Sequence, residues 1–401
     1  MDGGKLKGFG AYGCIFQPPL ECKYSKDTKT NPKYITKLLT NESAEREWKI
    51  SNFMKNNLPN YDNYAITWKS RCTPAKKQKD KDINKCMLAR GISRNPNNFT
   101  ILQARHGGIT LDQQIKNLLK VFRGNSNNKG KEWKLKYSLL IRGTEPLFQG
   151  ISDFYENEIV HNDIKDQNIV KLKKDASTLE KGSRFIDFGL SVLISKEMYL
   201  LKEKSLVSFE EPRWYFVYPP EYLFCMAPPI ELKDEFINVK KRIFYNEIRS
   251  LHVNYIETCT TNKEFDSKIK KIIRKAINGD FDSDSALYDM YMKTDVYSLG
   301  MSFLFLLEYL GREGSKKIMK DQFKRSKPGT FLGDFKILLQ KMMDLDYNKR
   351  IDATKAHKEF KYILSQNYRN ESSEKKTKKV KTVKNKTKKN RSKTKYKKKR
   401  P

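Results

Sequence analysis

The sequence has few of the side chains that bind metals or cross-link a chain. Only four histidines occur among its 401 residues. The six cysteines are far apart, with no C-x-x-C pair and no Cys/His group at the spacing of a zinc site. This usage argues against a zinc-binding module and predicts free, reduced thiols in an intracellular protein. The cysteines are Cys14, Cys22, Cys72, Cys86, Cys225 and Cys259.

Long apolar runs are also missing. The longest, Met301–Leu307, is far too short to span a bilayer. The first residues, MDGGKLKGFG, contain no apolar segment of the kind found in secretory signals. We therefore expect a soluble intracellular protein without membrane contact. Its 38% hydrophobic residues, with 22 Phe and 21 Tyr, suffice for the core of one large domain or of two lobes.

Acidic residues are absent from the end of the chain. Lys375–Pro401 contains 16 Lys or Arg and no acid, so residues 1–374 carry the other 65 basic residues and all 47 acids, a formal charge of +18. Such a field favours anionic partners: nucleic acid, acidic proteins or anionic lipid. The segment from about residue 370 has almost no large apolar side chains and is expected to be disordered when unbound.

Two functions fit the basic segment 375–401. It can serve as a solubilising or nuclear-targeting extension, or it can bind nucleic acid without sequence preference, because lysines that neutralise phosphates release counterions. We favour nucleic-acid association over nuclear import alone.

The first hundred residues show the alternation and turn signals of a small sheet. Residues 5–17 predict two short strands joined by a turn, Tyr34–Leu39 predicts a third strand, and a helix with acids in its first turn begins at Asn41. A polar, Lys-rich segment follows at 70–85. Two further strand candidates are Met87–Ile92 and Phe99–Ala104.

The rest of the chain is mostly helical in pattern, and it contains no repeats. The segments NIVKLKK and SRFIDF predict a short hairpin, and TDVYSLGMSFLFLLEYL predicts a buried helix. Residues 231–290 are charged and partly amphipathic. Further helices are predicted over residues 110–121, 132–157, 332–345 and 353–366.

A glycine-rich stretch, GFGAYGCI at residues 8–15, fits the pattern G-x-G-x-x-G-x-[VI]. Glycines let backbone N–H groups approach phosphate oxygens and permit a tight strand–turn–strand. A dinucleotide-binding fold would need a helix directly after the glycines, whereas FQPP continues a strand here. The candidate phosphate-binding residues are Lys7, Gly8, Phe9, Gly10, Ala11, Tyr12, Gly13, Cys14 and Ile15.

Lys37 lies on the predicted strand that follows, where a lysine can bind α- and β-phosphates. Such a lysine needs an acidic partner on the next helix. We choose Glu47, because Ile50 and Met54 then face the core with it, while Glu45 and Glu42 remain alternatives.

The stretch HNDIKDQN, residues 161–168, fits H-x-D-x-K-x-x-N. In phosphoryl transfer Asp163 would accept or orient a hydroxyl proton, Lys165 would neutralise charge on the transferred group, and Asn168 would bind magnesium. Nineteen residues beyond Asn168 the sequence reads IDFGLS, in which Asp187 would bind magnesium, Phe188 would pack beneath it and Gly189 would let the backbone turn.

With these motifs in this order, residues 5–365 resemble the eukaryotic-type protein kinases. YPPEYL (218–223) matches the family's A-P-E segment, TDVYSLG the helix whose aspartate braces the catalytic loop, and DLDYNKRIDATKAHKEF the closing segment. The resemblance implies a buried Glu221–Arg350 ion pair, a bracing role for Asp295, and a histidine, His161, that packs rather than catalyses.

The resemblance also implies a fold and an activity. The fold class is α+β and bilobal, with an N-lobe at 1–105, a C-lobe at 106–368 containing an insertion near 231–290, and a basic tail at 369–401. The activity is transfer of the ATP γ-phosphoryl group to Ser or Thr hydroxyls of proteins, with Mg²⁺ or alternatively Mn²⁺. Lys165 and the P-P-E segment favour a Ser/Thr kinase over tyrosine or small-molecule kinases.

Three features are similar to those of kinases of giant nucleocytoplasmic DNA viruses: the stretch GAYGCIFQPPLEC, the bias toward Lys, Asn and Ile, and the basic tail. That resemblance implies a place in the host cytoplasm, the host nucleus or the virion. The rival interpretations are an inactive kinase-fold scaffold and a nucleic-acid-associated protein that acts through its tail. The intact Lys37, Asp163, Asn168 and Asp187 argue against a scaffold.

Three departures from the family matter. Asn162 replaces the arginine that commonly binds a phosphate on the activation segment, so phosphorylation of Ser205 or Ser208 is not expected to be an obligatory switch. Trp214 lies where Ser/Thr kinases usually carry a threonine, so peptide preference does not transfer. The 231–290 insertion is predicted to be a helical elaboration rather than a docking device.

Overall fold

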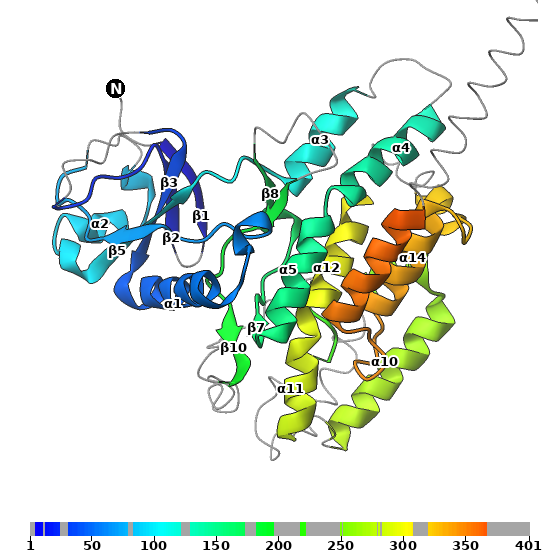
Figure 1. The fold of residues 1–401 in the computed structure, drawn as a ribbon. Coiled ribbons are helices and arrows are strands. Elements are labelled where there is room, and N and C mark those ends of the chain that lie inside the picture. Colours follow the sequence, from blue (N-terminus) through cyan, green and yellow to red (C-terminus); the bar gives the residue numbers. More distant parts are fainter. Residues whose placement is uncertain are drawn as a thin grey trace, which may run out of the picture.

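The computed structural model shows a small antiparallel sheet with one long helix in the N-terminal part and a mostly helical C-terminal part (Figure 1). This α+β arrangement is compatible with the predicted bilobal fold. The structure describes residues 5–10, 13–24, 31–78, 83–121, 129–172, 182–195, 217–221, 249–250, 252–278, 280, 283–307 and 320–366. Predictions outside these residues concern Ala11, Tyr12, Ser205, Ser208, Trp214, Cys225, residues 231–248 and residues 369–401.

The N-terminal sheet has five antiparallel strands in the order β1-β2-β3-β5-β4. Gly10 pairs with Gly13 where β1 turns into β2. The strands predicted within 5–17, at Tyr34–Leu39 and at Phe99–Ala104 are confirmed. Their bounds are Lys5–Gly10 (β1), Gly13–Gln17 (β2), Tyr34–Thr40 (β3), Ser70–Cys72 (β4) and Phe99–Arg105 (β5).

Helix α1 (Asn41–Asn57) begins at the predicted residue. Thr40 caps it, because the Ser43 backbone N–H donates to the Thr40 hydroxyl at 3.4 Å, and Glu42 in the first turn favours the positive end of the helix dipole. Its buried face includes Glu47, Ile50 and Met54 at the spacing of one helix stripe. Glu47 is the single acid on that face, so the helix places its carboxylate against the sheet.

Met87–Ile92 is not a strand. Residues Ala89–Ile92 form the short helix α2, and Cys86, Ala89 and Ile92 are all buried, so every third residue faces the sheet. That spacing suits a helical turn, whereas a strand would bury every second residue. The strand beside β5 is instead β4, formed by the first residues of the segment expected to be polar and irregular, with Arg71 opposite Leu102.

The cysteines also differ from the prediction. Cys14 is bonded to Cys86 and Cys22 to Cys72, with Cα–Cα separations of 6.1 and 5.8 Å. Cys259 is free and buried. Sequence spacing could not reveal the two pairs, because the partners are 72 and 50 residues apart and only the sheet brings them together.

The C-terminal part surrounds helix α12 (Thr294–Phe305), whose residues 294–304 are all buried, as expected for this apolar segment. Helices α5, α11 and α14 lie around it (Figure 1). Residues 353–366 are helical as predicted. The other bounds are Leu111–Val121 (α3), Lys129–Arg142 (α4), Glu145–Glu156 (α5), Val253–Cys259 (α9), Asn262–Ile277 (α10), Asp284–Met292 (α11) and Phe331–Met342 (α14).

The single helix predicted over 132–157 is in fact two helices. Helix α4 ends at Arg142 and α5 begins at Glu145, with Pro146 in the first turn of α5. Proline has no backbone N–H and its ring collides with the preceding turn, so it ends one helix and suits the start of the next.

Short strands position the loop that contains HNDIKDQN. Strand β7 (Ile159–Val160) precedes the loop and pairs with β10 (Val192–Leu193). Strand β8 (Ile169–Lys171) follows the loop and pairs with β9 (Ser183–Phe185), which confirms the predicted hairpin. The third strand of that sheet is β6 (Ile109–Thr110). Both ends of the loop are therefore fixed by pairing.

None of the helices within the described ranges is long and apolar enough to cross a bilayer.

Candidate active site

Lys37 stands between two carboxylates. Its Nζ lies 2.5 Å from Oε1 of Glu47 and 2.7 Å from Oδ1 of Asp187. Burial alone would lower the pKa of Lys37, but Asp187 and Glu47 outweigh it and raise that pKa above its usual range. The ammonium group therefore stays charged, and it joins helix α1 to the segment that follows β9.

Of the three acids considered for Lys37, Glu47 is the one that contacts it. Glu42 pairs with Arg46 at 2.6 Å and Glu45 pairs with Arg71, both on the exposed side of the helix. Burial raises the pKa of Glu47, and the charge of Lys37 opposes that rise. The other carboxylate oxygen of Glu47 accepts a hydrogen bond from the indole of Trp68 at 2.9 Å.

Trp68 is a site residue that sequence reasoning missed. It lies between α1 and β4, it is 7% exposed, and its indole orients the carboxylate that binds Lys37. Nothing in its neighbouring sequence sets it apart, since the contact depends on how the helix crosses the sheet.

Asp163, Lys165 and Asn168 form one hydrogen-bonded group. Lys165 Nζ lies 3.0 Å from Oδ1 of Asp163, and the Asn168 amide donates to Oδ2 of Asp163 at 2.7 Å and to its backbone carbonyl at 2.9 Å. Burial raises the pKa of Asp163, and Lys165 lowers it in part. A buried carboxylate held in this way is suited to orient a hydroxyl group or accept its proton.

Asp295 holds the backbone of this loop, as the resemblance implied. Its two carboxylate oxygens accept the backbone N–H groups of His161 and Asn162 at 2.6 and 3.0 Å. Asn162 has φ 60°, a left-handed conformation that asparagine tolerates better than most residues. The Tyr218 hydroxyl donates to the Asn162 carbonyl at 3.0 Å. The loop is thus fixed through its main chain.

His161 packs and is neutral. Burial lowers its pKa to about 4. Its Nδ1 lies 3.3 Å from the Asp163 backbone N–H, and its Nε2 lies 3.2 Å from the Ile186 carbonyl. The centroid of its ring lies 4.6 Å from that of Phe188, with the two ring planes tilted by 43°. With Nδ1 accepting, the proton belongs on Nε2, so His161 ties the loop to the segment that carries Asp187.

The IDFGLS segment turns at Gly189 and Leu190, as expected, and the Ser191 backbone N–H donates to the Phe188 carbonyl at 3.2 Å across this turn. The left-handed backbone conformation lies two residues earlier, at Asp187. Asp187 has φ 65°, whereas no left-handed φ is found at Gly189. A Cβ on Gly189 would lie 2.9 Å from Oε1 of Glu47, so glycine is needed for close approach. Burial would raise the pKa of Asp187, but Lys37 outweighs it and lowers that pKa. The Asp187 side chain is 42% exposed and available to a ligand.

The glycine-rich hairpin lies beside Lys37, since Ile15 on β2 is opposite Lys37 on β3. A Cβ on Gly13 would lie 2.6 Å from the Leu38 carbonyl, so this glycine permits close strand pairing, while the space around Gly8 is open. Cys14 was named as a phosphate-binding residue. Its side chain instead bonds to Cys86, which leaves only its backbone for a ligand.

Asn168 and Asp187 are the candidate metal ligands. The Ile186 backbone N–H donates to the Asn168 carbonyl at 3.0 Å, which joins the two segments. The described chain contains no cluster of three or more His, Cys, Asp or Glu suited to a metal. One amide oxygen and one carboxylate fit Mg²⁺, which usually takes few protein ligands and completes its shell with water and phosphate oxygens.

A buried ion pair joins Glu221 to Arg350 in the helical C-terminal part. Arg350 Nη2 lies 2.6 Å from Oε1 of Glu221, with both side chains at most 1% exposed, as the resemblance implied. The Arg350 guanidinium also lies over the ring of Tyr297 at 4.7 Å. Burial raises the pKa of Glu221 against the attraction of Arg350.

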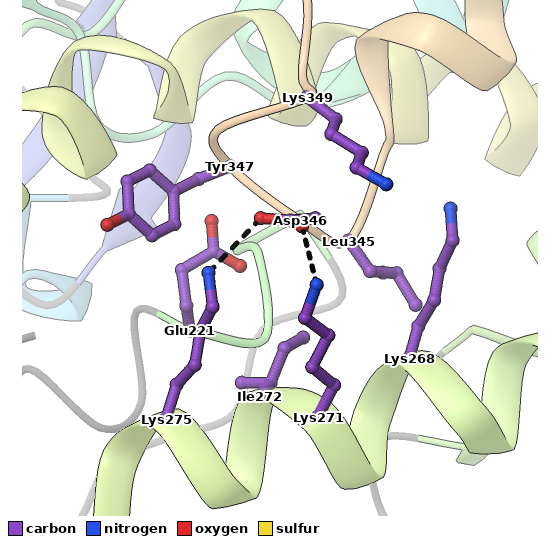
Figure 2. A pocket seen from close by; sticks show the side chains of 9 residues that line it. All are labelled: Glu221, Lys268, Lys271, Ile272, Lys275, Leu345, Asp346, Tyr347 and Lys349. Atoms are coloured by element: carbon purple, nitrogen blue, oxygen red, sulfur yellow. Dashed lines mark hydrogen bonds and ion pairs between the residues drawn. The ribbon is translucent and has the colours of Figure 1, made fainter. Parts of the chain in front are cut away.

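A cavity of about 100 Å³ lies beside this pair, and none of the candidate catalytic residues lines it (Figure 2). Lys271 and Lys275 of α10 each lie 3.4 Å from a carboxylate oxygen of Asp346, and Lys268 lies 2.9 Å from Asp344. Helix α10 lies within residues 231–290, the segment that the sequence analysis predicted to be an insertion. Its lysines connect the helix to the loop that leads to Arg350.

Comparison of the chain with known proteins finds no matching family model and no similar curated protein.

Proposed function

We propose that the protein is a Ser/Thr protein kinase that transfers the γ-phosphoryl group of ATP to protein hydroxyls. The observation that carries the proposal is the ion-pair chain from Glu47 through Lys37 to Asp187, which lies next to a loop that presents Asp163, Lys165 and Asn168. Phosphoryl transfer depends mainly on positioning and charge, and this arrangement supplies both.

Each residue has a role that follows from its contacts. Lys37 would bind the α- and β-phosphates, and Glu47, held by Trp68, would keep the ammonium in place. Asp187 and Asn168 would hold Mg²⁺, which neutralises charge on the phosphates when bound.

Asp163 would orient the substrate hydroxyl and take its proton, and burial makes this carboxylate a better base by raising its pKa. Lys165, 3.0 Å away, would stabilise negative charge on the transferred group. The hydroxyl oxygen forms the new P–O bond as the bond to the ADP leaving oxygen breaks.

The test compares the full chain with its Asp163→Asn variant in a γ-labelled ATP assay on a basic generic protein. We expect the variant to lose nearly all transfer and to retain ATP binding, because Asp163 does not contact Lys37. Retained binding shows that the variant is folded. Equal transfer by both proteins refutes the catalytic assignment, and absence of transfer by the natural sequence with ATP bound favours the scaffold interpretation.

A further inference from the structure

Four of the six cysteines join the same two parts of the N-terminal sheet. Cys14 lies on β2 and Cys22 follows it, while their partners Cys86 and Cys72 lie at either end of the segment 72–86. Cys14–Cys86 thus connects the glycine-rich hairpin with the connection between β4 and β5, while Cys22–Cys72 connects the segment that follows β2 with the end of β4.

The β4–β5 connection covers the face of the sheet opposite α1. One buried cluster contains Cys14, Leu38, Cys86 and Ile101, whereas neighbouring residues of the same strands, such as Leu39, pack in a second cluster with α1. Alternate residues of a strand point to opposite faces. The disulfides therefore hold the hairpin from the side opposite α1 and Glu47.

Cys14 transmits that restraint to the candidate phosphate site through the backbone. It follows Gly13 and precedes Ile15, which is opposite Lys37. Because Gly13 has no side chain to pack, the bond from Cys14 to Cys86 is a direct side-chain restraint beside the turn of the hairpin, where Gly10 pairs with Gly13.

The two bonds differ in access. Cys14 and Cys86 are 4% and 0% exposed, whereas Cys22 and Cys72 are half-buried. Cys22–Cys72 is therefore the more accessible bond to a small thiol, and attack on Cys14–Cys86 requires local opening around these buried sulfur atoms.

If the Cys22–Cys72 bond is reduced, backbone hydrogen bonds still join the two segments that carry these cysteines. The Lys23 N–H donates to the Thr73 carbonyl at 2.9 Å, and the Ala75 N–H donates to the Glu21 carbonyl at 2.8 Å. No such backbone pairing is found between Cys14 and Cys86 in the described residues, where the contact is through buried side chains. Cys14–Cys86 is therefore the bond whose state matters to the hairpin.

We propose that Cys14–Cys86 is a thiol–disulfide modification site that controls ATP affinity by restraining the glycine-rich hairpin. The reagent is a dithiol, either a small molecule or a protein. One thiolate attacks a cystine sulfur and releases the other as a thiolate, and the second thiol of the reagent resolves the mixed disulfide. The cystine thereby gains two electrons and two protons, and the dithiol becomes a disulfide. The effect on ATP rests on the proposed kinase function.

The experiment uses full-length protein prepared without reductant and a portion treated with dithiothreitol. Free thiols are counted by alkylation and mass spectrometry, exchange of the β1–β2 amides is measured with deuterium, and the Kd for ATP is measured by calorimetry. We expect Cys14, Cys22, Cys72 and Cys86 to resist alkylation before reduction and to be alkylated after it. Reduction should speed exchange in the hairpin and raise the Kd for ATP at least about threefold.

Two double variants separate the bonds. Cys14→Ser/Cys86→Ser should bind ATP like the reduced natural protein and should no longer respond to dithiothreitol. Cys22→Ser/Cys72→Ser is the matched control, with the same substitutions nearby, and it should keep the response. If the first variant does not fold, hydrogen exchange of the natural sequence in its two redox states still tests whether the disulfide restrains the hairpin.

Six free thiols in the unreduced protein would overturn the proposal. So would unchanged hairpin exchange after complete reduction, or an unchanged Kd for ATP while exchange is faster. If neither redox state binds ATP, the kinase proposal and the effect on ATP both fail, and the thiol count and hairpin exchange then show separately whether the bonds restrain the hairpin.

Discussion

Lys37 and Glu47 form an ion pair in which both side chains are less than one-tenth exposed and the charged atoms lie 2.5 Å apart. The pair connects β3 with α1, and Asp187 extends it to the helical part of the protein.

Replacing Glu47 by Gln should therefore impair transfer. The amide cannot balance the ammonium group of Lys37, so we expect kcat/KM to fall at least about tenfold, which corresponds to roughly 1.4 kcal/mol of transition-state stabilisation. Glu45→Gln is the control, since Glu45 is on the same helix but contacts Arg71 on the surface. Steady-state kinetics of the two variants check this, and equal losses in both would contradict the assignment of Glu47.

His161 should make stability depend on pH. Its pKa is about 4 in the folded protein and 6.5 in the unfolded chain, so the unfolded state binds the proton more readily between these values. The contribution is complete above pH 6.5 and is lost as the pH falls toward 4, by about 3 kcal/mol in all.

Urea unfolding at several pH values measures this dependence. His161→Gln should flatten the curve between pH 4 and 6.5, because glutamine does not titrate. A slope that persists unchanged in the variant would assign the dependence to carboxylates instead.

The buried Glu221–Arg350 pair should be costly to break from one side. Glu221→Gln leaves the Arg350 charge buried without its carboxylate partner, and we expect a loss of about 3–5 kcal/mol in the free energy of unfolding. Lys341→Ala is the comparison, because its pair with Glu359 is half-exposed and worth at most about 1 kcal/mol. Similar losses of unfolding free energy in both variants would contradict a large contribution from the buried Glu221–Arg350 pair.

Activity should not depend on phosphorylation. Asn162 stands where the protein kinases that the sequence resembles commonly have a phosphate-binding arginine, and here the loop is held by Asp295 and Tyr218. Protein made in bacteria and treated with phosphatase should keep most of the transfer rate of a mock-treated sample. Loss of nearly all activity after phosphatase treatment would contradict this prediction.

The basic segment should account for much of any binding to DNA. Residues 375–401 contain 16 basic side chains, and each phosphate that they neutralise adds about 0.9 to the slope of log affinity against log salt. Removing residues 370–401 should reduce that slope for duplex DNA, measured by fluorescence anisotropy. A slope that is the same with and without the segment would assign the binding to the rest of the chain.

Much of the fold follows from local pattern. Alternation around glycines determines β1 and β2, and the Thr40 cap with its acidic first turn determines where α1 begins. The loop at 161–168 and the segment around Asp187 are also local motifs, because their chemistry needs certain residues at short spacing. Such features depend on neighbours in sequence, so the sequence alone determines them.

Other features depend on contacts between distant segments. The choice of Glu47 over Glu42 and Glu45 depends on the rotation of α1 against β3, and the orienting contact of Trp68 depends on the same packing. Local propensity did not distinguish strand from helix at Met87–Ile92. Packing against the sheet decided for the helical conformation. The cysteine pairs show the same limit, since strand pairing and the returning β4–β5 connection bring Cys14 to Cys86 across 72 residues. Sequence by itself determined which residues are chemically able to act, and only tertiary packing decided which of them meet.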